Sequence, residues 1–243
     1  MRGFTASKPI DALLRATFCA VGFSIIWLGC PLPTLASTGY QIDVWRAEDG
    51  LPQSTVTSVA QTREGYLWIG TQNGLVRFDG VAFKVFNQNN TPAIKNNRIV
   101  QLFVDQQGTL WVGAEEGNLV RFKEGKFVSF AMPGIGSPFN YARAICNDAA
   151  QNVWVMSCEW RLLRFAEDNF TVPSLNWTLA GTRATAVASD RAGRVYVGSD
   201  RELAIWEDRK FQAVCGQENE PGFQVEFLAS SRTDGCWVAG NGR

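Results

Sequence analysis

The chain has 243 residues, with 23 lysines and arginines against 23 aspartates and glutamates, and it contains no histidine. A neutral chain gives no electrostatic support for nucleic-acid binding, which depends on a basic surface. The lack of histidine excludes Ser-His-Asp and Cys-His catalysis and also removes the commonest metal ligand.

Residues 1–36 are predicted to form a signal peptide or an N-terminal anchor. Arg2, Lys8 and Arg15 make a basic region, which the apolar segment 16–29 follows. Residues 34–37, Thr-Leu-Ala-Ser, resemble a small-residue cleavage site. The apolar segment is shorter than the roughly 20 residues of a membrane-spanning helix, which favours a secretory signal. The protein is therefore expected to be periplasmic or otherwise extracytoplasmic, either exported or held at the membrane by this segment.

A short pattern, glycine followed by an aromatic or aliphatic strand, occurs five times along the rest of the chain. Its first residues are Gly65, Gly108, Gln151, Gly193 and Gly235, which step by 43, 43, 42 and 42 residues. The clearest copy is residues 65–70, Gly-Tyr-Leu-Trp-Ile-Gly. A period of about 40–50 residues with strand patterning inside it is typical of β-propeller blades.

The repeat at 56–86 indicates what each copy forms. Segments 56–60, 66–71, 75–78 and 83–86 are rich in β-branched and aromatic residues and are separated by tight turns. Four short antiparallel strands of this kind make one propeller blade. The predicted blades are about 56–86, 99–130, 143–173, 184–214 and 225–243. One third-strand position carries aromatic residues that are expected to fill the wedge between neighbouring blades, namely Phe78, Phe122, Phe165 and Trp206.

The predicted fold is thus an all-β propeller of four-stranded antiparallel blades, incomplete, with about four and a half blades within residues 37–243. Residues 40–45 are predicted to be the closing strand, which pairs with the last blade. The final repeat supplies only half a blade, which would leave an unpaired sheet edge. Repeat arrays also need capped ends. We therefore expect this chain to be the first part of a longer protein.

Residues 45–53, Trp-Arg-Ala-Glu-Asp-Gly-Leu-Pro-Gln, resemble the lead-in of two-component regulator propellers. Residues 65–80 and 105–113 are similar to the repeat of that family, whereas the third, fourth and fifth repeats resemble it more loosely. The resemblance implies the periplasmic sensor region of a membrane receptor. Such a region is typically followed by an immunoglobulin-like domain, a transmembrane helix and a histidine kinase or diguanylate cyclase output.

That resemblance implies the partners: the remaining blades, the downstream signalling domains, and a small-molecule or saccharide ligand whose identity is unknown. Attachment to the membrane would come from the N-terminal segment or from a helix beyond residue 243. A histidine kinase needs a phosphoacceptor histidine, and this chain has none. The chain itself is therefore expected to be non-catalytic, with no cofactor, no metal and no nucleic-acid partner.

Loops between the second and third strands of each blade face one side of a propeller, where ligands usually bind. The candidate ligand-binding residues in these loops are Asn73, Glu115, Glu116, Trp160 and Arg161. A tryptophan beside an arginine could stack on a sugar ring or hold an anion. The alternative is that Trp160 packs against a neighbouring loop.

Asp105, Asp148 and Asp190 recur at the turn before the first residue of the glycine–aromatic pattern. Their regular repeat position indicates turn residues that bond nearby backbone, rather than paired acid–base catalysts. Without residues 1–36 the chain keeps Cys146, Cys158, Cys215 and Cys236. An exported chain permits disulfides among them, and buried free thiols fit the sequence equally well.

Three functions stay open from the sequence. The first is the input part of a signalling receptor. The second is a secreted or periplasmic propeller that binds carbohydrate or protein without signalling. The third is part of a periplasmic propeller enzyme, which histidines or clustered acids in further blades would favour.

Overall fold

The structure is a computed structural model that describes residues 42–133, 140–173, 183–215 and 224–240. The chain divides into two units, residues 1–44 and residues 45–243. Residues 42–44 are the described part of the first unit, and they form no regular structure. The predicted signal peptide or anchor lies outside the described residues. No helix in the described ranges is long and apolar enough to cross a membrane.

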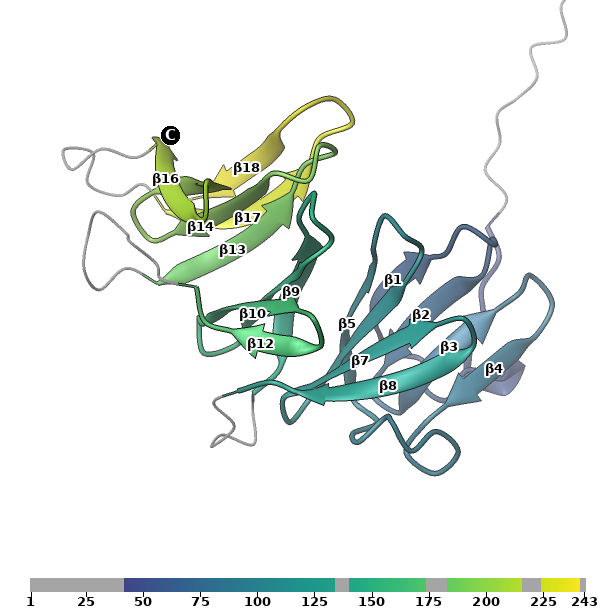
Figure 1. Cartoon of the computed structure of the whole chain (residues 1–243). Helices are drawn as coiled ribbons and strands as arrows, with labels where there is room; N and C mark the ends of the chain where they lie inside the picture. The colour runs from purple at the N-terminus through teal and green to yellow at the C-terminus, as the bar shows by residue number, and fades with distance from the viewer. Residues whose placement is uncertain (1–41, 134–139, 174–182, 216–223, 241–243) are drawn as a thin grey trace, which may run out of the picture. The chain divides into compact units, whose positions relative to one another are not determined.

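The described structure consists almost entirely of strands grouped in small antiparallel sheets (Figure 1). The first sheet contains β1 (Val56–Gln61), β2 (Leu67–Thr71), β3 (Gly74–Phe78) and β4 (Phe83–Phe86). The second contains β5 (Ile99–Val104), β6 (Leu110–Ala114), β7 (Asn118–Lys123) and β8 (Lys126–Ala131). Each sheet keeps its strands in chain order, as a propeller blade does.

The later repeats follow the same plan. The third sheet contains β9 (Ala142–Asn147), β10 (Val153–Ser157), β11 (Leu162–Ala166) and β12 (Asn169–Thr171). The fourth contains β13 (Ala184–Ser189), β14 (Val195–Ser199), β15 (Leu203–Glu207) and β16 (Lys210–Cys215). In the fifth, β17 (Val225–Ser230) pairs with β18 (Cys236–Gly240). The predicted all-β propeller fold, incomplete within this chain, is confirmed.

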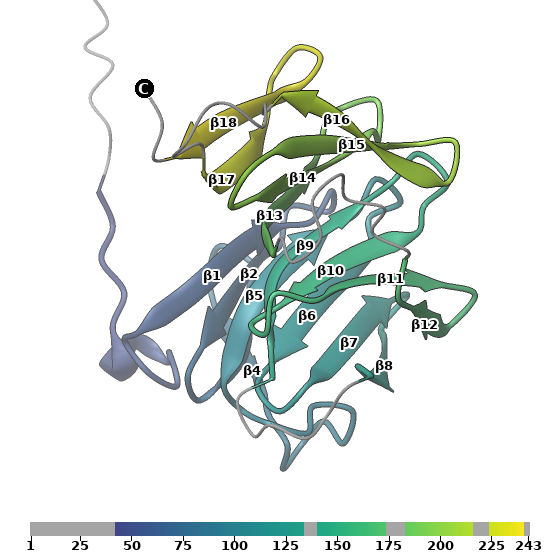
Figure 2. The same cartoon turned by 90° about the vertical axis from the view of Figure 1, so that its left-hand side faces the viewer.

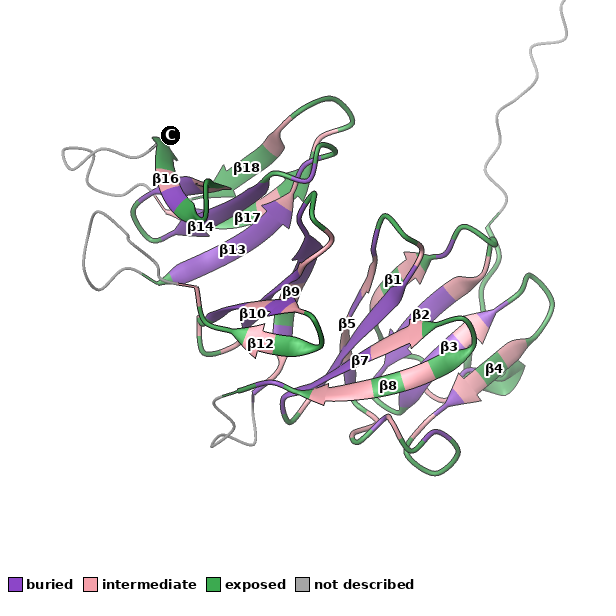
Figure 3. Ribbon diagram, in the orientation of Figure 1, coloured by how far each residue is buried: buried purple, intermediate pink, exposed green. Residues whose placement is uncertain are grey.

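Burial follows the position of a strand within its sheet (Figure 3). Every residue of β6, β10 and β14 is buried, whereas the residues of the outer strand β8 are all exposed or half-buried. A strand that is covered on both faces reads as a continuous apolar run, and that is what the glycine–aromatic pattern supplies. The repeat pattern therefore marks the most buried strand of the second, third and fourth sheets, whereas its copy in β18 is mostly exposed.

Successive sheets pack through their first two strands (Figure 2). Strand β5 contacts β1 and β2, β9 contacts β5 and β6, and β13 contacts β9 and β10. The second glycine of the pattern permits this approach. A Cβ atom added to Gly113 would lie 2.9 Å from Cβ of Ala142 in the next sheet. The sequence thus needs glycine there because the next first strand lies against its backbone.

Aromatic residues fill the wedges between sheets, as predicted. The ring of Trp68 lies 4.9 Å from that of Phe122 in the next sheet. The corresponding ring distance is 5.5 Å for Trp111 and Phe165. It is 4.9 Å for Trp154 and Trp206. The second-strand tryptophan of one blade therefore packs on the third-strand aromatic of the next.

The first sheet receives the same contact from Trp45. The ring of Trp45 lies 5.0 Å from Phe78 and 6.3 Å from Phe83. The matching distances from Trp68 in the next wedge are 4.9 Å to Phe122 and 6.4 Å to Phe127. Trp45 thus occupies the place that the second-strand tryptophan of a preceding blade would take.

The predicted closing strand at 40–45 does not appear among the described residues. Residues 42–45 form no strand, and residues 40 and 41 lie outside the described ranges. A strand needs a hydrogen-bonded neighbour, and none of the described strands pairs with this segment. Pairing with a last blade stays a prediction, while the observed contribution of this segment is the ring of Trp45.

The fifth repeat is shifted by one residue from its predicted alignment. Trp237 pairs with Ala229 across the β17–β18 hairpin, as Tyr196 pairs with Ala188 in the fourth sheet. Trp237 therefore matches Tyr196, and the repeat begins at Asp234. The prediction that it begins at Gly235 is wrong because that glycine, at φ 93°, sits one position later in the turn.

Candidate functional site

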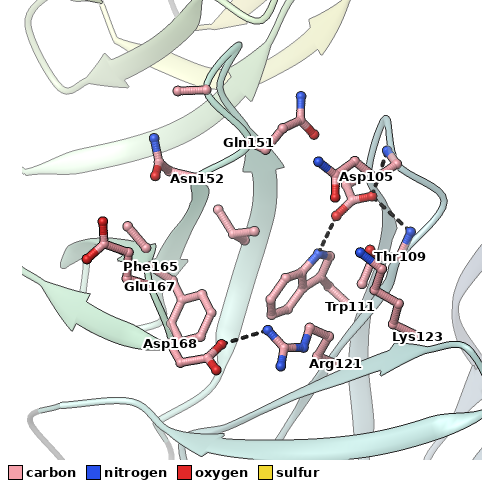
Figure 4. A pocket seen from close by; sticks show the side chains of 14 residues that line it. Asp105, Thr109, Trp111, Arg121, Lys123, Gln151, Asn152, Phe165, Glu167 and Asp168 are labelled. Atoms are coloured by element: carbon pink, nitrogen blue, oxygen red, sulfur yellow. Dashed lines mark hydrogen bonds and ion pairs between the residues drawn. The ribbon is translucent and has the colours of Figure 1, made fainter.

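The recurring aspartates hold both the turn and the buried tryptophan of their blade. Oδ1 of Asp105 accepts hydrogen bonds from the backbone N–H groups of Gln107 and Thr109, each at 2.9 Å. Its Oδ2 accepts a hydrogen bond from Nε1 of Trp111 at 2.9 Å (Figure 4). The predicted turn role is confirmed. The bond to the tryptophan was not predicted, although the spacing of six residues is visible in the sequence.

The same arrangement recurs in the third and fourth sheets. Oδ2 of Asp148 accepts a hydrogen bond from Nε1 of Trp154 at 3.0 Å. In the fourth sheet tyrosine replaces tryptophan, and the hydroxyl of Tyr196 lies 3.4 Å from Oδ2 of Asp190. Arg194 donates from Nε to the same oxygen at 2.6 Å. These carboxylates are therefore structural anchors whose acceptor oxygens are occupied.

Asp190 stays ionised in spite of its position. Burial acts to raise its pKa, but hydrogen bonds from the backbone and side chain of Arg194 outweigh burial and lower the pKa below its ordinary value of 3.8. A carboxyl group with a lowered pKa stabilises the folded state above its unfolded pKa, and this contribution is lost as the pH falls through the folded pKa. Asp190 is accordingly unsuited to act as a general acid near neutral pH.

The first repeat lacks this anchor, because Thr62 stands where the other repeats have aspartate. Thr62 and Trp68 are only 7% and 1% exposed. Within the described part of the chain, Oγ1 of Thr62 and Nε1 of Trp68 have no hydrogen-bond partner. A buried donor without an acceptor costs about 1–3 kcal/mol.

Thr62→Asp is therefore expected to stabilise the protein. The new carboxylate would accept from Nε1 of Trp68, as Asp105 does from Trp111, and would raise the free energy of unfolding by about 1 kcal/mol after its own desolvation. Urea unfolding of the two chains measures the difference. Thr62→Asn keeps an acceptor without the charge and should give a smaller gain. A loss of stability with Thr62→Asp would show that the first turn cannot hold the anchor.

The five predicted ligand-binding residues lie in equivalent β2–β3, β6–β7 and β10–β11 loops. Among the described interactions no contact joins any two of them. Glu115 forms an ion pair with Arg98 at 3.2 Å, and Glu116 is exposed with φ 63°. Asn73 donates from Nδ2 to the carbonyl of Pro52 at 3.5 Å. These side chains share one edge of their sheets without forming one cluster.

Trp160 is half-buried, and Arg143 lies over its ring at 4.3 Å from the centroid. Arg161 beside it is exposed. A cation over an aromatic face is attracted by the ring quadrupole. The partner of Trp160 is thus a residue of strand β9 in its own sheet, and not a neighbouring loop. This contact fixes the orientation of the Trp160 ring.

A cavity of about 650 Å³ lies between the second and third sheets (Figure 4). The Asp105–Trp111 anchor lines it on one side, and Phe165 lines it on the other. NH1 of Arg121 forms an ion pair with Oδ1 of Asp168 at 2.6 Å across it. Two pairs of polar side chains in this cavity bond to each other, Trp111 to Asp105 and Arg121 to Asp168, and the second pair joins the two blades.

A second cavity, of about 790 Å³, lies where the turns between first and second strands come together. Three of its lining residues are Arg63, Arg191 and Arg232, and all three are exposed. They stand at the same repeat position, directly after Thr62, Asp190 and Ser231. The sequence could have indicated this cluster, because the three arginines recur at the spacing of the repeat.

Cys146 and Cys236 have free thiols. Burial raises the pKa of the Cys146 thiol. Burial, aided by the carboxylate of Asp190, raises the pKa of Cys236 to about 11. Both groups are protonated at neutral pH and therefore weak nucleophiles. The expectation of buried free thiols is thus confirmed for Cys146.

Residues 50–73 and 93–116 match the two component regulator propeller family. A stretch of 41 residues is 49% identical to Histidine kinase P4 of Formosa agariphila. That stretch is 17% of this chain and 3% of the kinase. The family match confirms the resemblance inferred from the sequence. Its residues, 50–73 and 93–116, fall on the two repeats in which the glycine–aromatic pattern is clearest.

Solved structures share the fold. The extracellular domain of BT4673 from B. thetaiotaomicron, assigned to a hybrid two component system, aligns with 83% of this chain at 17% identity and a TM-score of 0.62. Virginiamycin B lyase from Staphylococcus aureus aligns with 79% at 12% identity and a TM-score of 0.59. The alignments span 27% of the BT4673 chain and 65% of the lyase. An extracellular domain of a two component system and an enzyme thus share this architecture, so the fold alone does not decide the function.

Proposed function

We propose that this chain, which carries two-component regulator propeller repeats, is the extracytoplasmic ligand-sensing input of a membrane-bound signalling receptor and is itself non-catalytic. The observation that carries the proposal is the family match over residues 50–73 and 93–116. Similarity of the chain to a histidine kinase and to extracellular domains of hybrid two component systems supports it. The chain has no phosphoacceptor histidine, so the output would belong to other domains.

The occupied acceptors of the recurring aspartates support the non-catalytic part of this proposal. Asp105 and Asp148 each bond a buried tryptophan and the backbone of their own turn. General acid–base catalysis needs a carboxyl group within reach of a substrate proton and with a pKa near the working pH. The pKa of Asp190 is instead lowered below its ordinary value, which moves it further from neutral pH.

Two measurements test the proposal. The transcript is sequenced past the codon for Arg243, where we expect further repeats, a transmembrane helix and a kinase or cyclase domain. Export is tested by fusing an alkaline phosphatase, active only outside the cytoplasm, after Arg243. A stop codon soon after a closed ring would select the secreted binding propeller instead. A histidine-containing active site in further blades would select the enzyme.

Within this proposal, the loops that carry Asn73, Glu115, Glu116, Trp160 and Arg161 form the ligand face. The ring of Trp160, held on one side by Arg143, offers a stacking surface for a sugar. Trp160→Ala is expected to weaken retention of the full chain on a neutral oligosaccharide array by at least tenfold. Trp237→Ala, at a tryptophan in another sheet, is the matched control. Equal retention of both variants would remove Trp160 from the proposed face.

A further inference from the structure

The cavity lined by Arg63, Arg191 and Arg232, here called the arginine mouth, concentrates positive charge on a neutral chain. The whole chain has 23 basic and 23 acidic residues. The mouth has these three arginines and one lining carboxylate, Asp190. That carboxylate is already paired with Arg194 at 2.6 Å. The local excess of positive charge is therefore not an effect of composition.

The three guanidinium groups keep donors available. Arg63 donates to the backbone carbonyl of Gln106 in the next sheet, and Arg191 donates from NH1 to that of Arg232 at 3.5 Å. None of the three arginines forms an ion pair with a described carboxylate. Each guanidinium has five N–H donors in a fixed fork, so one bond to a carbonyl leaves most of them free.

Inter-blade bonds also fix where two of these arginines lie. Arg63 and Arg191 stand at one repeat position, and each bonds the residue at that position in the following sheet. The turns of neighbouring blades are thereby held together, which orders the charges around one opening. Ser189, Ser230 and Ser231 line the same cavity.

We propose that the arginine mouth binds a small ligand bearing carboxylate or sulfate groups. Planar guanidinium forks match these oxyanions bidentately, and hydroxyl groups add weaker hydrogen bonds. The mouth lies at the β1–β2-type turns, whereas Trp160 lies in a β10–β11 loop. Successive turns of an antiparallel sheet lie at opposite ends of its strands, so the two sites are separate. The inference rests on the proposed function in treating the chain as a ligand-binding module.

Arg232→Gln is the decisive variant, because the guanidinium of Arg232 makes no bond with any described residue, and its loss should leave the fold intact. Binding to the full chain is measured by titration calorimetry with trigalacturonate, which carries three carboxylates, and with neutral maltotriose. We expect trigalacturonate to bind at least tenfold more tightly. Arg232→Gln should weaken that binding about tenfold, with an unchanged melting temperature. Arg201→Gln, at an exposed arginine in the β14–β15 turn, should bind as the unmodified chain does.

Inorganic sulfate serves as competitor. Competition would extend the site to sulfate groups, and its absence would restrict the site to carboxylates. Three results would overturn the proposal that the arginine mouth binds such a ligand. They are equal binding of both sugars, full affinity in Arg232→Gln, and failure of every probe to bind. None of those results bears on export or on domains past Arg243, which test the proposed function separately.

Discussion

Trp154→Ala is expected to lower the free energy of unfolding by about 3–5 kcal/mol, the range for removing a large buried aromatic side chain. Trp154 is 0% exposed. Its ring contacts those of Trp206 and Phe211 in the next sheet, at 4.9 and 5.8 Å. The substitution would empty the wedge between the third and fourth sheets and leave Asp148 without its indole partner. Urea denaturation of the full chain, followed by tryptophan fluorescence and circular dichroism, measures the loss.

Trp237→Ala is the control that the repeat itself provides. Trp237 stands at the same repeat position but is 71% exposed. Surface substitutions usually change stability by no more than about 0.5 kcal/mol. Equal losses at the two positions would mean that the tryptophan acts within its own blade, and would contradict the wedge between blades.

The blades could be predicted from the sequence because their signals are local. Each buried second strand follows a turn and combines tryptophan or tyrosine with β-branched neighbours, as in 65–70 and 108–113. A strand pattern and a turn residue lie within a few positions of each other, so one repeat is enough to place the strands. The equivalent third repeat, which lacks both glycines, forms the same four strands because Val153–Ser157 keeps the apolar run.

Contacts between blades were harder to predict, because they join residues about one repeat apart. The position of Trp45 against Phe78 depends on an empty wedge that exists only in three dimensions. The position of residues 40–45, where the fourth strand of a preceding blade would lie, favoured a strand, but the described part of that segment has no partner strand. Arg143 over Trp160 was equally hard to predict although it lies within one blade, because the cation comes from the first strand and the ring from a later loop.

The arginine mouth was harder to predict than the strands and easier to predict than the contacts between blades. Its members recur at one repeat position, so the sequence contains the pattern. Whether that position faces outward or toward a common opening depends on how the turns of several blades converge, which the repeat length alone does not determine. The same reasoning applies to the buried anchors: Asp105 and Trp111 are six residues apart in the sequence, but their bond requires that the turn fold back over the second strand.

The anchor of the third sheet makes the second large prediction. Asp148→Ala is expected to lower the free energy of unfolding by about 2–4 kcal/mol. Oδ1 of Asp148 accepts from the backbone N–H of Asn152 at 2.8 Å, and its Oδ2 accepts from Nε1 of Trp154 at 3.0 Å. Hydrogen bonds to charged groups contribute about 1.5–3 kcal/mol, and a buried donor that loses its acceptor adds a desolvation cost. Asp148→Asn keeps an acceptor oxygen and should lose about half as much.

A double-mutant cycle separates the two roles of this carboxylate. If Asp148 acts mainly through the indole, its removal should cost much less once Trp154 has been replaced by phenylalanine, which fills the wedge without an N–H donor. The interaction energy would then be at least about 1 kcal/mol, within the range found for residues in direct contact. Strict additivity would contradict the anchor and assign Asp148 to the turn alone. Coupling would explain why aspartate and tryptophan occur together in the second and third repeats. The first repeat lacks the aspartate, and there Nε1 of Trp68 is buried without an acceptor among the described residues.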